Sequence, residues 1–591
     1  MDDFGGEAVV SSALKRTMSQ QGSNQGSQMN APVRSATASF ANRVAAQIVI
    51  ALLAATLSSC APLKPYRTIA EAPVDCTPID LGSDMPDDPS FGAVPTACAP
   101  NLIKEVSSGR GAGQGGAYEL HFVEYDDQGM LYPSGVAKYG QAHQQAKLFL
   151  SDLRKELLNA DVESGNTPYS VVIFVHGWKN NARSDNENVR WFRAALTQLS
   201  DVEEVTCHRK IVGAYVGWRG AGTSLNTAHI WNDLIEDTTF FSRQRAATRV
   251  GQGEIRELLA RVRAIEDEAD ATWIRTKAAS KDRTHNVAPS RPLEDQAGAL
   301  CQKPVRVLIV GHSFGGRIVY TALADAMIRD MEALRERIRL EKTEHSNRPA
   351  VLQREGDVVI AISPAIEATS FVPLYRTAAS DPLGGSDTQE YIRQYHTPMF
   401  VSITSYDDVA TRIAYPIAAH VTTLGYLYPK GDRERERRAA LETLGQDQDY
   451  VSYRLMLPSQ EKRRRQFEQV IPDPLCATIN RSTSMKERAR VELQRTNEFI
   501  QQLGKYAWDA NAAEVYPRQF CTDGQVDKES PEEFSMVLAP VSDKINLNSP
   551  IWNIYTSHPI LNDHSDLLNP ILLDFLRQLY EEGGSPNIQL Q

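Results

Sequence analysis

Strand-like and helix-like patterns of apolar residues alternate through the middle and the end of the chain. Short runs that are largely apolar, or that alternate with polar residues, predict strands at Tyr118–Tyr125, Val171–Val175, Ile211–Val216, Val305–Val310, Val358–Ile362, Met399–Ile403 and Ile551–Tyr555. Helical spacing occurs at Gln141–Leu158, Glu187–Leu199, Glu254–Ala269, Gly316–Leu340, Asp387–Gln394 and Leu567–Tyr580. The alternation predicts an α/β fold with a mostly parallel central sheet and helices on both faces.

Two stretches near the N-terminus lack such patterns. Residues 1–42 are rich in Ser, Gln, Gly, Asn and Ala and show no hydrophobic period, which predicts a disordered extension. Residues 61–115 are dense in Pro, Gly, Ser and Asp, and this composition predicts a flexible tether that leads to the folded body.

Residues 43–60, between these stretches, have the pattern of an export signal. Arg43 precedes the apolar run Val44–Leu57, which has the length of a signal-peptide core and is shorter than the roughly 20 residues of a spanning helix. Leu57-Ser58-Ser59-Cys60 follows and resembles the lipobox of bacterial lipoproteins, in which the cysteine receives lipid. The resemblance implies a signal peptide and a protein anchored by lipid at Cys60 to a bacterial membrane, on the periplasmic or outer side of the envelope.

Two alternatives remain for this segment. It can be an uncleaved anchor in which Cys60 is incidental. The other alternative is that translation starts at Met29, because the region before the apolar run is longer than such signals require. That start would leave Arg34 and Arg43 as a positive flank of ordinary size.

Composition narrows the class of protein. The apolar share of 42% and the charged share of 23% are close to average globular usage, so most of the chain is expected to fold around buried cores. The formal net charge of −11 disfavours a nucleic-acid partner, because phosphate binding requires a concentrated basic surface.

The cysteines fit an oxidising compartment. Six remain once Cys60 is assigned to lipid, and an even number in an exported chain favours disulfides over six buried free thiols. Proximity along the chain favours the pairs Cys76–Cys98 and Cys476–Cys521, and elimination leaves the pair Cys207–Cys301.

The segment Gly311-His312-Ser313-Phe314-Gly315-Gly316 contains the pattern G-x-S-x-G. It directly follows one predicted strand and precedes a predicted helix, which places Ser313 on a tight turn with its hydroxyl above the sheet edge. Gly311 and Gly315 are expected there because side chains would crowd such a turn. An ordinary glycine-rich turn is the alternative.

A serine hydroxyl becomes nucleophilic only when a base takes its proton, and a carboxylate must orient that base. We predict His564, in a loop after the last predicted strand, as the base, with His558 as its competitor. The acid is expected between serine and histidine in the sequence. We predict Asp408 for this role, and Asp407 remains the alternative.

The four segments His176-Gly177-Trp178, Gly311–Gly316, Thr404–Asp408 and Asp563–Asp566 together resemble the α/β-hydrolase superfamily of esterases and lipases. The resemblance implies an eight-stranded sheet and hydrolysis of esters or amides by a serine nucleophile, with no metal and no cofactor. It also implies an oxyanion hole formed by the backbone N–H groups of Phe314 and Trp178, and structural roles for His176 and His312.

The same resemblance sets the domain boundaries and the expected function. Residues 116–410 and 549–591 are expected to form the two parts of the core, separated by an insertion at 411–548 that can act as a lid. The expected substrate is a small-molecule or lipid ester, and the sequence identifies no protein partner. The alternative function is an envelope interaction protein that has the same scaffold and little or no catalysis.

Overall fold

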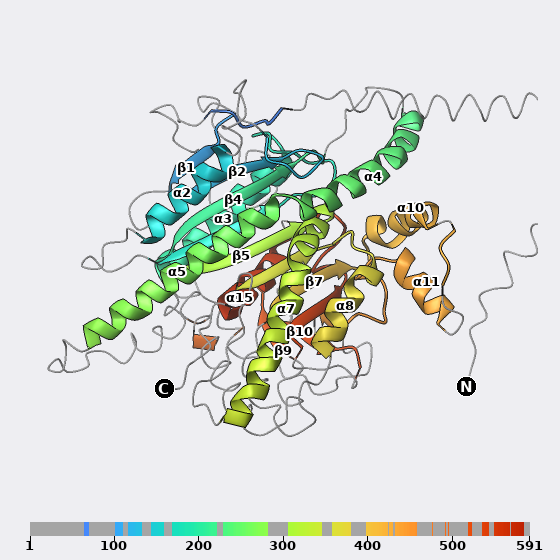
Figure 1. Ribbon diagram of the computed structural model, residues 1–591. Coiled ribbons are helices and arrows are strands. Elements are labelled where there is room, and N and C mark those ends of the chain that lie inside the picture. Colours follow the sequence, from blue (N-terminus) through green and yellow to red (C-terminus); the bar gives the residue numbers. More distant parts are fainter. Residues whose placement is uncertain are drawn as a thin grey trace, which may run out of the picture. The chain divides into compact units, whose positions relative to one another are not determined.

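The structure of the chain is a computed structural model, and its described residues all follow Cys60 (Figure 1). They are residues 64–69, 101–109, 116–132, 144–158, 168–220, 229–281, 305–344, 357–379, 398–423, 425–428, 432–457, 476, 491, 494–495, 518–522, 535–542, 549–567 and 569–583. The predicted extension 1–42, signal peptide 43–60 and helix Asp387–Gln394 lie outside these ranges and remain predictions.

Eleven strands form one sheet in the order β1-β2-β4-β3-β5-β6-β7-β11-β8-β10-β9. Seven neighbouring pairs are parallel and three are antiparallel. The seven strands expected from the sequence are present as β2 (Ala117–Tyr125), β3 (Tyr169–Val175), β4 (Lys210–Trp218), β5 (Val305–His312), β6 (Val358–Ile362), β7 (Phe400–Ser405) and β11 (Ile551–Thr556). The α/β class and the mostly parallel sheet are therefore confirmed.

Each face of the sheet has its own apolar core, because successive side chains of a strand point to opposite faces. In β3, Val171, Ile173 and Val175 belong to one core, and Val172 and Phe174 belong to the other. The first core packs against α2 (Gln144–Leu158), α4 (His229–Gln252), α5 (Ile255–Lys281), α7 (Phe314–Glu344) and α8 (Ala368–Ala379). The second packs against α3 (Glu187–Val205) and α15 (Pro570–Gly583). No helix within the described ranges is both long enough and apolar enough to span a bilayer.

Part of the segment predicted as a flexible tether is built into the sheet. Strand β1 (Lys104–Ser108) pairs with β2 in antiparallel register. Further upstream, the side chain of Arg67 is buried, forms an ion pair with Glu105 at 2.8 Å and donates a hydrogen bond to the carbonyl of Ala182. The tether prediction was wrong for residues 64–69 and 101–109, because backbone pairing and a buried ion pair order segments that carry little apolar patterning.

The segment between the last two predicted strands adds three strands to the sheet. Strand β8 (Tyr453–Met456) pairs in parallel with β11, and β10 (Ser535–Pro540) joins β8 to β9 (Arg518–Cys521) through antiparallel pairs. The sheet therefore has eleven strands where the family resemblance implies eight. The same segment also supplies helices α10 (Tyr415–Thr422) and α11 (Arg433–Leu441), which pack against each other near α8 (Figure 1).

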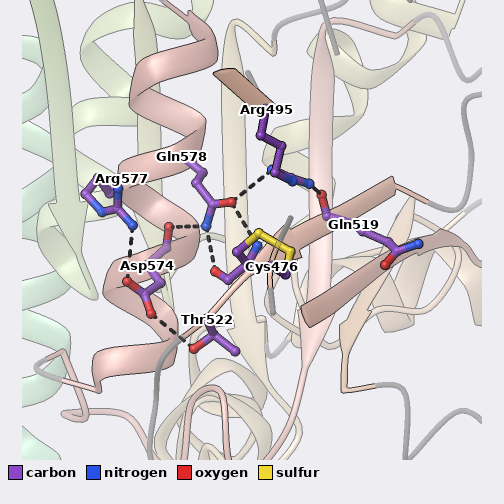
Figure 2. Close-up of a disulfide and its surroundings, with 8 residues drawn as sticks. Cys476, Arg495, Gln519, Thr522, Asp574, Arg577 and Gln578 are labelled. Atoms are coloured by element: carbon purple, nitrogen blue, oxygen red, sulfur yellow. Dashed lines mark hydrogen bonds and ion pairs between the residues drawn. A yellow bond between two sulfur atoms is a disulfide. The ribbon is translucent and has the colours of Figure 1, made fainter. Parts of the chain in front are cut away.

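A disulfide joins Cys476 to Cys521 at the end of β9, as the sequence predicts. Figure 2 shows its surroundings, where Gln578 of α15 lies beside the disulfide. The Gln578 amide accepts a hydrogen bond from the Cys521 N–H at 2.9 Å and donates one to the Cys521 carbonyl at 2.7 Å. Cys207 is also disulfide-bonded, whereas Cys76, Cys98 and Cys301 lie outside the described residues, so the other two pairings remain predictions.

We expect removal of the Cys476–Cys521 disulfide to destabilise the protein. The bond closes a sequence separation of 45 residues, and the chain-entropy relation gives a loss of about 4 kcal/mol for a loop of that size. The double variant Cys476→Ala with Cys521→Ala should therefore unfold at a lower urea concentration than the wild type. Peptide mapping without reductant should recover Cys476 linked to Cys521, and a different partner for either cysteine would contradict the pairing.

Candidate active site

Four parallel strands bring the predicted site residues to one edge of the sheet. Strands β3, β5, β7 and β11 run in the same direction, so the loops after them leave from the same edge. Trp178 follows β3, Ser313 follows β5, Asp408 follows β7 and His564 follows β11. Crevices at the carboxyl edge of such sheets are the usual place for ligands.

Ser313 occupies a sharp turn between β5 and α7. Its φ of 56° is in the left-handed region, which is uncommon for residues other than glycine. The turn packs tightly against the end of β3, since a Cβ atom on Gly315 would lie 2.0 Å from the carbonyl oxygen of Val175. A Cβ atom on Gly311 would lie 2.6 Å from the Gly315 carbonyl oxygen. Glycine is therefore required at both predicted positions.

The structure joins the three predicted residues in one chain of hydrogen bonds. His564 Nε2 lies 2.8 Å from Ser313 Oγ, and His564 Nδ1 lies 2.9 Å from Asp408 Oδ2. Ser313 and Asp408 are buried, and the His564 side chain is partly exposed. An imidazole between a hydroxyl and a carboxylate is arranged to take the hydroxyl proton while the carboxylate orients the ring.

The two competing residues lie together outside this chain. The Asp407 carboxylate accepts a hydrogen bond from the backbone N–H of His558 at 3.0 Å. The His558 ring contacts the side chain of Asn562, and both Asp407 and His558 are exposed. The structure therefore places Asp408 and His564 at Ser313, and it places Asp407 and His558 beside each other.

The surroundings of Asp408 favour its ionised form. Burial raises the pKa of Asp408, but the hydrogen bonds from His564 and from the backbone N–H of Thr411 outweigh burial and leave that pKa below its usual value. Asp408 is thus a carboxylate at neutral pH, as an orienting acid must be.

Two further histidines near Ser313 are buried in their neutral form. His176 accepts a hydrogen bond from the Trp218 N–H and contacts the Gly177 carbonyl, and burial lowers its pKa to about 4. His312 Nε2 donates to the backbone carbonyl of His564 at 2.7 Å, and burial together with the nearby His564 lowers the pKa of His312 to about 3. These hydrogen bonds agree with the structural roles expected for both residues, and His312 directly anchors the loop that carries His564.

The turn after β3 lies directly against Ser313. A Cβ atom on Gly177 would be only 2.8 Å from the Ser313 Cβ, so the following residue, Trp178, borders the serine. The N–H of Phe314 is the first of α7, and the first N–H groups of a helix have no partner within it. Phe240 of α4 packs against both rings, 5.7 Å from that of Trp178 and 5.2 Å from that of Phe314.

A polar network behind Ser313 was missed at the sequence level. Arg317 of α7 forms a bidentate ion pair with Glu367 at 2.9 and 3.0 Å and contacts the Tyr415 hydroxyl, which lies on α10. The pair raises the pKa of Arg317 and lowers that of Glu367 against the opposing effect of burial. The three residues come from segments far apart in the sequence, so no local pattern indicates the contact.

One cluster of the described residues has the geometry of a metal site. The ligand atoms of Glu119, His121 and Asp152 lie within 4.8 Å of one another. However, the Lys104 ammonium is 2.7 Å from Glu119 and 2.9 Å from Asp152, so it already forms an ion pair with each carboxylate. Glu119 and His121 belong to β2, three strands away from β5.

The buried histidines predict acid sensitivity of the fold. Because the folded-state pKa of His176 is about 4 and the unfolded value is near 6.5, the unfolded chain binds the extra proton between these values. The contribution of neutral His176 to the free energy of unfolding is therefore complete above about pH 6.5. It should fall by about 2 kcal/mol between pH 7 and pH 5. The urea midpoint should therefore drop less over this interval in His176→Gln than in the wild type. The same substitution at exposed His558 should leave the drop unchanged.

Comparisons with known proteins find nothing similar to this chain. No protein-family model, no curated protein and no solved structure matches it. A chemical role for Ser313, His564 and Asp408 is therefore to be inferred from their geometry.

Proposed function

We propose that this protein is a serine hydrolase that cleaves carboxylic esters, with Ser313 as nucleophile, His564 as general base and acid, and Asp408 as orienting acid. The observation that carries the proposal is the continuous hydrogen-bond chain from Ser313 Oγ through His564 to Asp408, at 2.8 and 2.9 Å. The left-handed turn at Ser313 and the chain order serine, aspartate, histidine agree with an α/β-hydrolase.

The proposed reaction proceeds in two halves. His564 Nε2 takes the Ser313 proton as Oγ attacks the ester carbonyl, and the oxyanion accepts hydrogen bonds from the N–H groups of Phe314 and Trp178. His564 then gives the proton to the departing alkoxide, which leaves an acyl ester on Ser313. Water then attacks the acyl carbonyl while His564 Nε2 takes a proton from it. The bond from the acyl carbon to Ser313 Oγ breaks, His564 returns the proton to Oγ, and the carboxylic acid leaves. No metal or cofactor is required by this scheme.

The surroundings of Ser313 favour an apolar acyl group. Trp178, Phe240 and Phe314 form an aromatic cluster beside the two proposed oxyanion donors. Aromatic side chains provide large apolar contact areas, so an acyl chain bound against this cluster would place its carbonyl near Ser313. A lipid or small-molecule ester fits this arrangement.

The triad assignment predicts which variants lose activity. A fluorophosphonate probe should label Ser313 in the wild type, and Ser313→Ala should abolish labelling and hydrolysis of a short p-nitrophenyl ester because the nucleophilic oxygen is gone. His564→Ala should lower kcat by about 10⁶-fold and Asp408→Asn by about 10⁴-fold, the aspartate change being the milder because the base remains.

The neighbouring residues provide matched controls. His558→Ala and Asp407→Asn make the same chemical changes in the adjacent pair and should stay within about tenfold of the wild type. Circular dichroism establishes that each variant is folded. If the folded wild type were neither labelled by the probe nor active on any ester, the alternative of an interaction protein on this scaffold would replace the hydrolase.

We further propose that the protein is exported and anchored by lipid at Cys60 to a bacterial membrane on the periplasmic or outer side of the envelope. The support is the apolar run Val44–Leu57 followed by Leu57-Ser58-Ser59-Cys60. The mature protein should begin at Cys60 and sediment with membranes, and Cys60→Ala should accumulate as an unlipidated precursor. Equal lipid mass on the wild type and on Cys60→Ala by mass spectrometry would exclude the anchor.

A further inference from the structure

A cavity of about 1050 Å³ lies beside the loop of the proposed acid, where the carboxyl ends of β7, β11 and β8 meet α10 and α11. Tyr406 and Arg412, on either side of Asp408 in the sequence, line it. Ser313, Asp408 and His564 are absent from its lining. The cavity is therefore a separate site that shares a loop with the proposed triad.

The lining of this cavity is rich in arginine. Arg412, Arg437, Arg438 and Arg454 contribute to it, together with only two carboxylates, Glu434 and Glu442. Burial and the nearby Asp447 raise the pKa of Glu442.

Three of the arginines have no acidic partner among the described residues. Arg438 is neutralised by Asp447 and Asp449. Arg412 instead stacks 3.8 Å above the Tyr406 ring and donates to its hydroxyl, and Arg437 contacts the His420 ring. The Nε of Arg454 is buried without a hydrogen-bond partner. Guanidinium groups arranged in this way suit an oxyanion, which they bind through charge-assisted hydrogen bonds.

An exposed apolar stripe runs beside the cavity. Of the ten large apolar side chains that are exposed in the described residues, six lie between Tyr406 and Leu427. Val409, Ile413 and Ile417 are 62%, 50% and 66% exposed and are spaced four residues apart.

The stripe and the cavity lining occupy adjacent faces of one helical segment. Arg412, Pro416 and His420 line the cavity with the same four-residue spacing. The segment comprises the π-helical turn η3 (Ala410–Ala414) and α10. Residues three apart are neighbours on a helix surface, so the apolar stripe borders the cavity along its length.

We propose that this cavity binds the anionic group of a lipid whose apolar chain lies along Val409, Ile413 and Ile417. A basic cavity alone fits any oxyanion, and an apolar stripe alone fits many partners, but their adjacency matches a molecule with one anionic end and one apolar chain. Such a molecule would contact Tyr406 and Arg412 and would restrain the loop that carries Asp408. The inference does not depend on the proposed hydrolysis, because it concerns binding at residues outside the triad.

Calorimetric titration with dodecyl phosphate below its micelle concentration tests this site. The full chain with Ser313→Ala is the binding partner, so that turnover plays no part. We expect dodecyl phosphate to bind more tightly than inorganic phosphate, which lacks the chain, and than dodecyl maltoside, which lacks the charge. Arg437→Gln should weaken the binding about tenfold by removing a charge-assisted hydrogen bond. Ile417→Ser should weaken it about fivefold by removing apolar contact.

Matched variants outside the site provide the controls. Arg435 lies on the same helix as Arg437 but pairs with Asp449 outside the cavity, and Val106 is exposed on β1. Arg435→Gln and Val106→Ser should leave the dissociation constant within about twofold. Equal affinity for dodecyl phosphate and dodecyl maltoside, equal affinity for dodecyl and inorganic phosphate, or no binding of dodecyl phosphate would each overturn the proposal. If dodecyl phosphate binds but the esterase assay fails, only the proposed hydrolysis is contradicted.

Discussion

The close approach of the turn at Ser313 to the end of β3 is the contact on which the site depends. Gly315 lies so near the Val175 carbonyl, and Gly177 so near Ser313, that neither position accommodates a Cβ atom. This proximity brings the first N–H groups of α7 and the turn after β3 to the same point as the serine. A left-handed residue at position 313 is costly in isolation, and the packing on both sides of the turn compensates for it.

The histidine reaches Ser313 because several backbone contacts fix its loop. Besides the hydrogen bond from His312 to the His564 carbonyl, Ser405 Oγ donates to the Leu561 carbonyl at 2.6 Å. The end of β7 and the turn after β5 thus both hold the loop that follows β11. Three side chains from distant parts of the sequence are aligned by a framework of short, mostly buried hydrogen bonds, and such preorganisation is what acid–base chemistry requires.

The sequence predicts the parallel centre of the fold well and its margins poorly. Strands such as β3 and β6 are buried on both faces, so their apolar runs are unmistakable. Strands β8 and β9 have only four residues each, too few for periodicity to distinguish them from loops. The G-x-S-x-G turn locates Ser313, but the choice between Asp407 and Asp408 depends on which carboxylate meets a histidine 156 residues away. The arginine-lined cavity is lined by residues spread from Tyr406 to Ser557 in the sequence. No local sequence pattern predicts that these residues come together.

The position of β11 in both the sheet and the sequence has a consequence for biosynthesis. This strand is hydrogen-bonded between β7 and β8, so its place is complete only after the intervening segment has folded. The chain is made from its N-terminus, and Ser313 is synthesised 251 residues before His564. During that interval His564 is not available to Ser313. The histidine that contacts Ser313 therefore follows the last strand of the described sheet in the sequence and is made well after the turn that holds the serine.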